Sequence, residues 1–120
     1  MKVIGLHHVQ LAMPPGEEEA ATRFYEGLLG IPRVAKPAHL EVRGGCWFES
    51  DKVRIHLGVE ADFRPSKKAH PALMVESLDA LRAQLTEAGV SIVDDHPLPM
   101  FTRFYVSDPF GNRIELLSSL

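Results

Sequence analysis

The stretch that decides the fold lies near the C-terminus and reads Arg103-Phe104-Tyr105-Val106-Ser107-Asp108-Pro109-Phe110-Gly111-Asn112-Arg113-Ile114-Glu115-Leu116-Leu117. Two runs rich in β-branched and aromatic residues flank Asp-Pro-Phe-Gly-Asn, in which proline fixes φ while glycine and asparagine tolerate positive φ. This pattern predicts a β-hairpin. Alternation in the second run places Ile114 and Leu116 on one strand face and Glu115 on the other. Glu115 is therefore expected either on a solvated face or at a site that needs a carboxylate.

The first half of the chain predicts a strand, a helix and several short strands. Residues 6–13 alternate as a half-buried strand, and residues 17–30 have acidic residues in the first turn, apolar residues at helical spacing and a final glycine. An amphipathic helix laid on a sheet is therefore predicted. The short strands that should follow are residues 33–35, 40–42, 46–49 and 53–59.

The same order of elements begins again after a surface linker at residues 62–68. Residues 70–75 alternate like the first strand, Ser77 can cap a helix that Gly89 ends, and further strands finish in the C-terminal hairpin. We therefore predict one α+β domain over residues 1–120. It consists of two modules in tandem, about 1–60 and about 68–120.

A local match between the halves indicates an internal repeat. Residues 46–51 with 54–57 resemble residues 103–108 with 113–116, apart from a turn two residues longer in the second copy. A repeat of this length is unlikely to arise by chance. By this pairing His56 is the counterpart of Glu115, and His70 is the counterpart of His8.

These four residues are candidate metal ligands: His8, His56, His70 and Glu115. Each lies on the strand face opposite its apolar neighbours. If both halves curl around a common cavity, the four side chains converge, and imidazole with carboxylate suits Zn, Ni, Co, Mn or Fe(II). The alternative is a metal-free cleft in which the four hydrogen-bond one another.

The composition narrows the class of protein. A net charge of −3 gives no reason to expect nucleic acid or an anionic membrane as a partner, and no apolar run has spanning length. The N-terminus leads directly into strand-like sequence rather than into a signal peptide. The single cysteine, Cys46, excludes an internal disulfide and is expected to be a packed core thiol. We expect a cytoplasmic protein with a small-molecule substrate.

Three segments resemble the signature of the vicinal oxygen chelate superfamily: Leu6–Ala12, Phe24–Gly30 and Asp108–Leu116. That superfamily contains glyoxalase I, extradiol dioxygenases, fosfomycin-resistance enzymes, methylmalonyl-CoA epimerase and bleomycin-binding proteins. The resemblance covers essentially the whole chain. It implies paired βαβββ modules, curved mixed sheets that enclose a cleft with a divalent metal, and a homodimer.

The resemblance also implies roles for the four candidate ligands. His8, His70 and Glu115 fall on the three recurrent ligand positions of the family. His56 falls where glyoxalase I-like members have a fourth ligand, usually glutamate, so the metal is not identified. Glu115 is the expected catalytic residue, because a metal-bound carboxylate can leave the metal and act as a base.

Five further residues are candidates for substrate binding: Gln10, Trp47, Arg54, Tyr105 and Arg113. The two arginines share the strand face of the ligands and can either bind an anion in bidentate fashion or form salt bridges at the rim. Tyr105 lies ten residues before Glu115, where the resemblance to fosfomycin-resistance enzymes implies a substrate contact. Its other interpretation is ordinary aromatic packing.

We therefore expect a glyoxalase-like metal-dependent enzyme with lyase, isomerase or dioxygenase chemistry. His56 makes a two-carboxylate glyoxalase mechanism harder to write, and it would occupy a position that a dioxygenase needs for oxygen or catechol. The chain lacks the basic tail and potassium loop of fosfomycin enzymes. The alternative from another class is a small-molecule or antibiotic-binding resistance protein of the bleomycin type, with Trp47 in its groove and no catalysis.

Overall fold

A computed structural model describes residues 1–120 and divides them into two units, Met1–Phe63 and Arg64–Leu120. The first unit holds a four-stranded mixed sheet in the order β1-β4-β3-β2, in which β1 is parallel to β4 and the other pairs are antiparallel. Its elements are β1 (Val9–Met13), α1 (Glu18–Thr22), η1 (Arg23–Leu28), β2 (Arg33–Val34), α2 (Ala38–Glu41), β3 (Cys46–Glu49) and β4 (Arg54–Val59).

The amphipathic helix predicted after the first strand is confirmed as α1 and η1. It buries Ala21, Phe24 and Tyr25, and the Tyr25 ring stacks on Phe48 of β3 at 5.3 Å. Gly30 ends the helix with a φ of +72°, a conformation that glycine adopts without a Cβ clash. The second half has π-helical turns, because the amide of Leu29 donates to the carbonyl of Phe24 five residues earlier. The sequence pattern did not predict this widening.

The strand predicted at residues 40–42 is wrong, since α2 occupies this stretch. Pro37 starts the helix with the fixed φ that proline favours at such positions, and two glycines with positive φ, Gly44 and Gly45, follow it. Alanine, leucine and glutamate are also good helix formers. The other predicted strands of the first half form as β2, β3 and β4.

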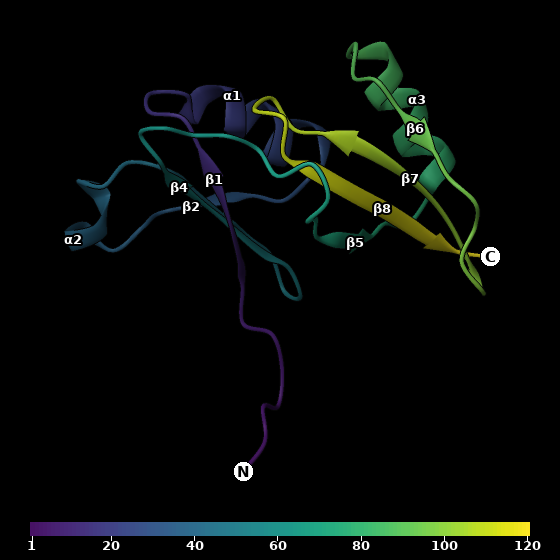
Figure 1. Ribbon diagram of the computed structural model, residues 1–120, viewed down its shortest axis with the longest axis horizontal. Helices are drawn as coiled ribbons and strands as arrows, with labels where there is room; N and C mark the ends of the chain where they lie inside the picture. Colours follow the sequence, from purple (N-terminus) through teal and green to yellow (C-terminus); the bar gives the residue numbers. More distant parts are fainter. The chain divides into compact units, whose positions relative to one another are not determined.

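The second unit repeats the arrangement with the strand order β5-β8-β7-β6, and β5 is parallel to β8 (Figure 1). Ser77 caps α3 as predicted, its Oγ accepting from the amide of Ala80 at 3.2 Å. The C-terminal hairpin is confirmed as β7 and β8, and its turn is held by Asp108, whose Oδ1 accepts from the amides of Phe110 and Asn112. The elements are β5 (Ala72–Met74), α3 (Leu78–Glu87), β6 (Val93–Asp94), β7 (Phe101–Ser107) and β8 (Arg113–Ser119).

The strand register corrects the repeat alignment by one residue. Trp47 lies opposite His56 across β3 and β4, and Tyr105 lies opposite Glu115 across β7 and β8. Trp47 is therefore the counterpart of Tyr105, whereas the sequence alignment had paired it with Phe104. Both aromatic residues consequently stand on the same sheet face as the candidate ligands opposite them.

The hairpin turns differ in length by one residue rather than by two. Glu49 pairs with Arg54 across four intervening residues, and Ser107 pairs with Arg113 across five. The equivalence of His56 with Glu115 is unaffected, because β4 and β8 align as the sequence predicted.

The predicted core thiol is confirmed, since Cys46 is only 1% exposed. Burial raises the pKa of its thiol to about 11, which keeps it protonated at neutral pH. None of the helices is long and apolar enough to cross a membrane.

Gly45 provides a test of the packing that positions β3. Its φ is +82°, and an added Cβ would overlap the carbonyl oxygen of Leu57 on β4. Gly16 has a similar φ of +80° but open space around its Cα. Gly16→Ala should therefore lower the free energy of unfolding only by the strain of an alanine in the left-handed conformation, about 1–2 kcal/mol. Gly45→Ala should lower the free energy of unfolding by roughly 1–3 kcal/mol more than Gly16→Ala, because of the overlap with Leu57. Urea unfolding measures both values, and equal losses would contradict this packing.

Candidate functional site

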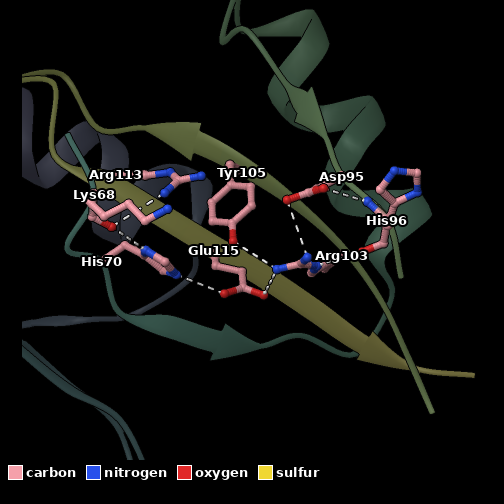
Figure 2. Close-up of polar contacts among 8 residues, drawn as sticks. All are labelled: Lys68, His70, Asp95, His96, Arg103, Tyr105, Arg113 and Glu115. Atoms are coloured by element: carbon pink, nitrogen blue, oxygen red, sulfur yellow. Dashed lines mark hydrogen bonds and ion pairs between the residues drawn. The ribbon is translucent and has the colours of Figure 1, made fainter. Parts of the chain in front are cut away.

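Glu115 is buried in the middle of β8, with only 5% of its surface exposed. Its Oε1 lies 3.0 Å from Nε2 of His70, and its Oε2 lies 3.2 Å from Nη1 of Arg103. Figure 2 shows the carboxylate between the imidazole and the guanidinium. The solvated-face interpretation of Glu115 is therefore excluded. A buried carboxylate is costly unless it is paired, and here both oxygens are paired.

The second ring nitrogen of His70 fixes how the imidazole faces Glu115. Its Nδ1 lies 2.8 Å from the carbonyl oxygen of Lys68. A carbonyl only accepts hydrogen bonds, so Nδ1 carries a proton. In the neutral imidazole, Nε2 then points a lone pair at the carboxylate. Two acceptors 3.0 Å apart need a proton between them, carried by Nε2 or by the carboxyl group, or a metal ion.

Arg103 of β7 is the residue of this cluster that the sequence analysis missed. Besides Glu115, its guanidinium contacts the Tyr105 hydroxyl at 2.9 Å, the His96 carbonyl at 2.8 Å and the Asp95 carboxylate at 3.3 Å (Figure 2). Desolvation lowers the pKa of Arg103, but its hydrogen bond to Glu115 and the neighbouring charges outweigh this and raise it. Arg103 could have been identified from strand alternation, because residues 103 and 105 are two apart and share a face of β7.

Tyr105 and Arg113, two of the predicted substrate-binding residues, lie beside Glu115. The Tyr105 ring meets His70 edge-on at 5.1 Å, and the guanidinium carbon of Arg113 lies 3.9 Å from its centroid. The hydrogen bond of Arg113 is a long one, 3.4 Å, to the Lys68 carbonyl. Most of its N–H donors therefore remain open to a bound anion.

In the first unit, His56 lies in a stack of rings on the corresponding sheet face. Its ring is parallel to Trp47 within 4° at 4.0 Å and stacks on His8 at 4.3 Å. Its Nε2 lies 2.7 Å from Oε2 of Glu49, a contact that the sequence analysis did not identify. The sequence did contain a signal for Glu49. It is two residues from Trp47 on β3, so the two side chains lie on the same strand face.

The remaining predicted residues of the first unit are His8, just before β1, Gln10 on β1 and Arg54 on β4. His8 is exposed, and its Nδ1 is 2.9 Å from Nδ1 of His7. Arg54 donates to the His7 carbonyl at 3.3 Å. Gln10 lies opposite His56 on β4, and its side-chain amide lies over Gly58, where an added Cβ would collide with it. Gln10 and Arg54 are thus on the same face as His56.

The four candidate ligands consequently form two pairs, one in each unit: His8 with His56, and His70 with Glu115. No group of three or more His, Cys, Asp or Glu side chains is gathered around a possible metal position. The donor chemistry of the second pair fits a metal, because a ligating histidine characteristically donates its other N–H to a backbone carbonyl, as His70 does to Lys68.

Residues 5–116 match the family model of the glyoxalase/bleomycin resistance protein/dioxygenase superfamily. The chain therefore belongs to this superfamily, as the sequence resemblance predicted, and its paired βαβββ modules are those the resemblance implied. A search of curated proteins found no match.

Solved structures agree with this assignment. A protein from Bacillus anthracis assigned to the glyoxalase family is 46% identical, with a TM-score of 0.94 over 100% of this chain and 98% of its own. A fosfomycin resistance protein from Listeria monocytogenes is 15% identical, with a TM-score of 0.77 over 99% and 96% of the two chains. A glyoxalase/dioxygenase from Nostoc punctiforme is 21% identical, with a TM-score of 0.79 over 97% and 91%. The last two are similar in fold alone.

Proposed function

We propose that this protein is a glyoxalase-type enzyme that depends on a divalent metal and binds adjacent oxygen atoms of a small substrate. The observation that carries the proposal is the His70–Glu115 pair, whose Nε2 and Oε1 face each other at 3.0 Å while Nδ1 of His70 contacts the Lys68 carbonyl. Membership of the glyoxalase superfamily supports it. The metal is Zn, Ni, Fe, Mn or Co, since imidazole and carboxylate ligands suit all of these.

The proposed ligands are His8, His70 and Glu115, with His56 as a fourth. His56 can join only through Nδ1 or by exchanging Glu49 for the metal, because Glu49 occupies its Nε2. The metal would act as a Lewis acid on the substrate oxygens. The contribution of the chain is to hold these oxygens near Glu115.

Glu115 is the proposed catalytic residue. A carboxylate released from one of its partners accepts a proton from the carbon next to a substrate carbonyl and can return it. Arg113 and Tyr105 would bind a negatively charged group of the substrate beside it, since the guanidinium has open donors and is held on the ring.

A specific observation also favours the second candidate, a small-molecule or antibiotic-binding protein without catalysis. The stacked rings of Trp47, His56 and His8, with the carboxylate of Glu49 beside His56, suit a planar aromatic cation. This function needs no metal. Metal content therefore separates the two candidates.

Metal analysis of protein purified without a histidine tag tests the proposal. Inductively coupled plasma mass spectrometry should find close to one transition metal per site in the wild type. Glu115→Ala and His70→Ala should lose it, because each removes one of two paired donors. His56→Ala decides between three and four ligands. His39→Ala is the matched control, since His39 is exposed on α2 and belongs to neither pair.

The metal found also directs the search for a substrate. Iron would indicate catechols with oxygen, whereas nickel or zinc would indicate α-keto aldehyde adducts and epimerisable thioesters. A folded wild type that contains no metal and takes up none of Ni, Zn, Mn or Fe(II) would contradict the enzyme proposal and favour the aromatic-cation binder.

We further propose that the protein is a cytoplasmic homodimer. The side chains of Val3, Ile4 and Leu6 are 91%, 94% and 79% exposed, and β1 and β5 are each the last strand of their sheet. Extended apolar residues and open strand edges are features that pairing with a second chain covers.

Sedimentation equilibrium tests this assembly. The wild type should have twice the 13.3 kDa mass of the chain. Ile4→Asp should shift it toward the monomer, because a charge would be buried on assembly. Val42→Asp introduces the same charge at another exposed apolar position of the first unit and should leave the mass unchanged. A monomeric wild type at micromolar concentration would contradict the homodimer.

A further inference from the structure

We propose that Lys68 and Arg113 together bind a tetrahedral dianion, a phosphoryl group carried by the substrate. Arg113 already binds a negatively charged group in the proposed function, so the proposal rests on that function and names the chemical class of the group. Lys68 is a new member of the site, because neither the sequence analysis nor the superfamily match gives it a role.

The end of the linker that precedes β5 holds Lys68 next to Arg113. At one point Pro65 lies against the turn of the β7–β8 hairpin, where a Cβ added to Gly111 would be 2.9 Å from Cγ of the proline. At another, the Lys68 carbonyl accepts from Nη1 of Arg113 at 3.4 Å and lies 2.8 Å from Nδ1 of His70. In Figure 2 the side chains of Lys68 and Arg113 extend in the same direction. The linker thus adds an ammonium group to the guanidinium.

Neither of these two cations has a carboxylate partner. The ion pairs of the second unit are made by His70, Arg82 and Arg103, and none of them includes Lys68 or Arg113. The chain as a whole has a net charge of −3, so two unpaired cations on one segment and its neighbouring strand are a local exception. Like charges repel, and a bound anion would relieve this repulsion.

The number of donors favours a dianion over a carboxylate. A planar guanidinium matches a carboxylate with two parallel N–H donors, so Arg113 alone would satisfy a carboxylate and leave Lys68 unpaired. A phosphoryl group has three terminal oxygens and nearly two negative charges at neutral pH, enough to accept from both cations at once. The guanidinium carbon of Arg113 is held 3.9 Å from the centre of the Tyr105 ring, which lowers the entropic cost of binding.

Tyr105 connects this anion site to Glu115. It lies opposite Glu115 across β7 and β8, and its ring contacts Arg113. The Tyr105 hydroxyl oxygen accepts from Nη1 of Arg103 at 2.9 Å, and the hydroxyl also has a proton to donate. No group of the chain accepts that proton. A substrate held at its phosphoryl group by Arg113 therefore has a free donor beside it for a second oxygen.

NMR titration of the full-length protein with inorganic phosphate, acetate and dihydroxyacetone phosphate tests the proposal. At about pH 8 phosphate is a dianion, and constant ionic strength keeps the screening equal. Phosphate should bind roughly 10-fold more tightly than acetate, because it gains a charge-assisted hydrogen bond to Lys68. Dihydroxyacetone phosphate should bind more tightly still, because its adjacent carbonyl oxygen can accept from the Tyr105 hydroxyl.

Three variants assign the preference to individual cations. Lys68→Ala should weaken phosphate binding roughly 10-fold and change acetate binding little. Arg113→Lys keeps the charge but loses the fork, so it should weaken the binding of both. Lys67→Ala is the matched control, since it removes the same charge from the neighbouring exposed residue and should leave every affinity unchanged. Equal losses in Lys67→Ala and Lys68→Ala would mean diffuse attraction by the linker and would overturn the site.

Tyr105→Phe distinguishes a group carried by the substrate from free phosphate. The phenylalanine keeps a ring against Arg113 but removes the hydroxyl. The affinity for dihydroxyacetone phosphate should therefore fall to that for inorganic phosphate, whose own affinity should stay the same. A wild type that binds the two probes equally would contain a site for free phosphate, and the assignment to a substrate would be overturned.

Metal content separates these outcomes from those of the proposed function. A wild type that contains metal but binds acetate as tightly as phosphate overturns the dianion site alone. A metal-free wild type whose phosphate binding depends on Lys68 overturns the metal proposal alone. A metal-free wild type that binds no phosphate overturns both.

Discussion

The carboxylate of Glu115 is the constraint on which the rest of the candidate site depends. It is buried in the centre of β8, where an unpaired charge would be strongly destabilising. His70 and Arg103 satisfy its two oxygens from opposite sides, and Tyr105 contacts both of these partners. The hairpin and the parallel β5–β8 pairing bring these side chains to one point, because Arg103 and Tyr105 are on β7, Glu115 is on β8 and His70 lies just before β5.

The duplicated module explains why the two units offer similar but unequal chemistry. At equivalent positions the first unit has His56 and Trp47 where the second has Glu115 and Tyr105. The first unit also pairs imidazole with carboxylate, but the carboxylate comes from Glu49 on the neighbouring strand. The same pleated scaffold thus yields a stacked aromatic face in one copy and a charged face with two arginines in the other.

Local patterns in the sequence predicted most of the fold and part of the site. The hairpin, the capped helix α3 and the parity of His70 and Glu115 follow from residue type and spacing, which act over a few residues. The segment 40–42 was too short for such a signal, and a proline start with a glycine end made it helical. Arg103 and Glu49 were missed because their roles depend on cross-strand register. The alignment by residue type was also shifted by one residue on β3, since it paired Trp47 with Phe104 instead of Tyr105.

The most direct test of the central claim is anomalous diffraction at the metal absorption edge, from crystals grown with Zn²⁺. The account predicts a peak about 2.0–2.2 Å from both Nε2 of His70 and Oε1 of Glu115. It also predicts that Nδ1 of His70 stays bonded to the Lys68 carbonyl. An ordered His70–Glu115 pair in direct contact, with no anomalous peak beside it at saturating Zn²⁺, would contradict the account.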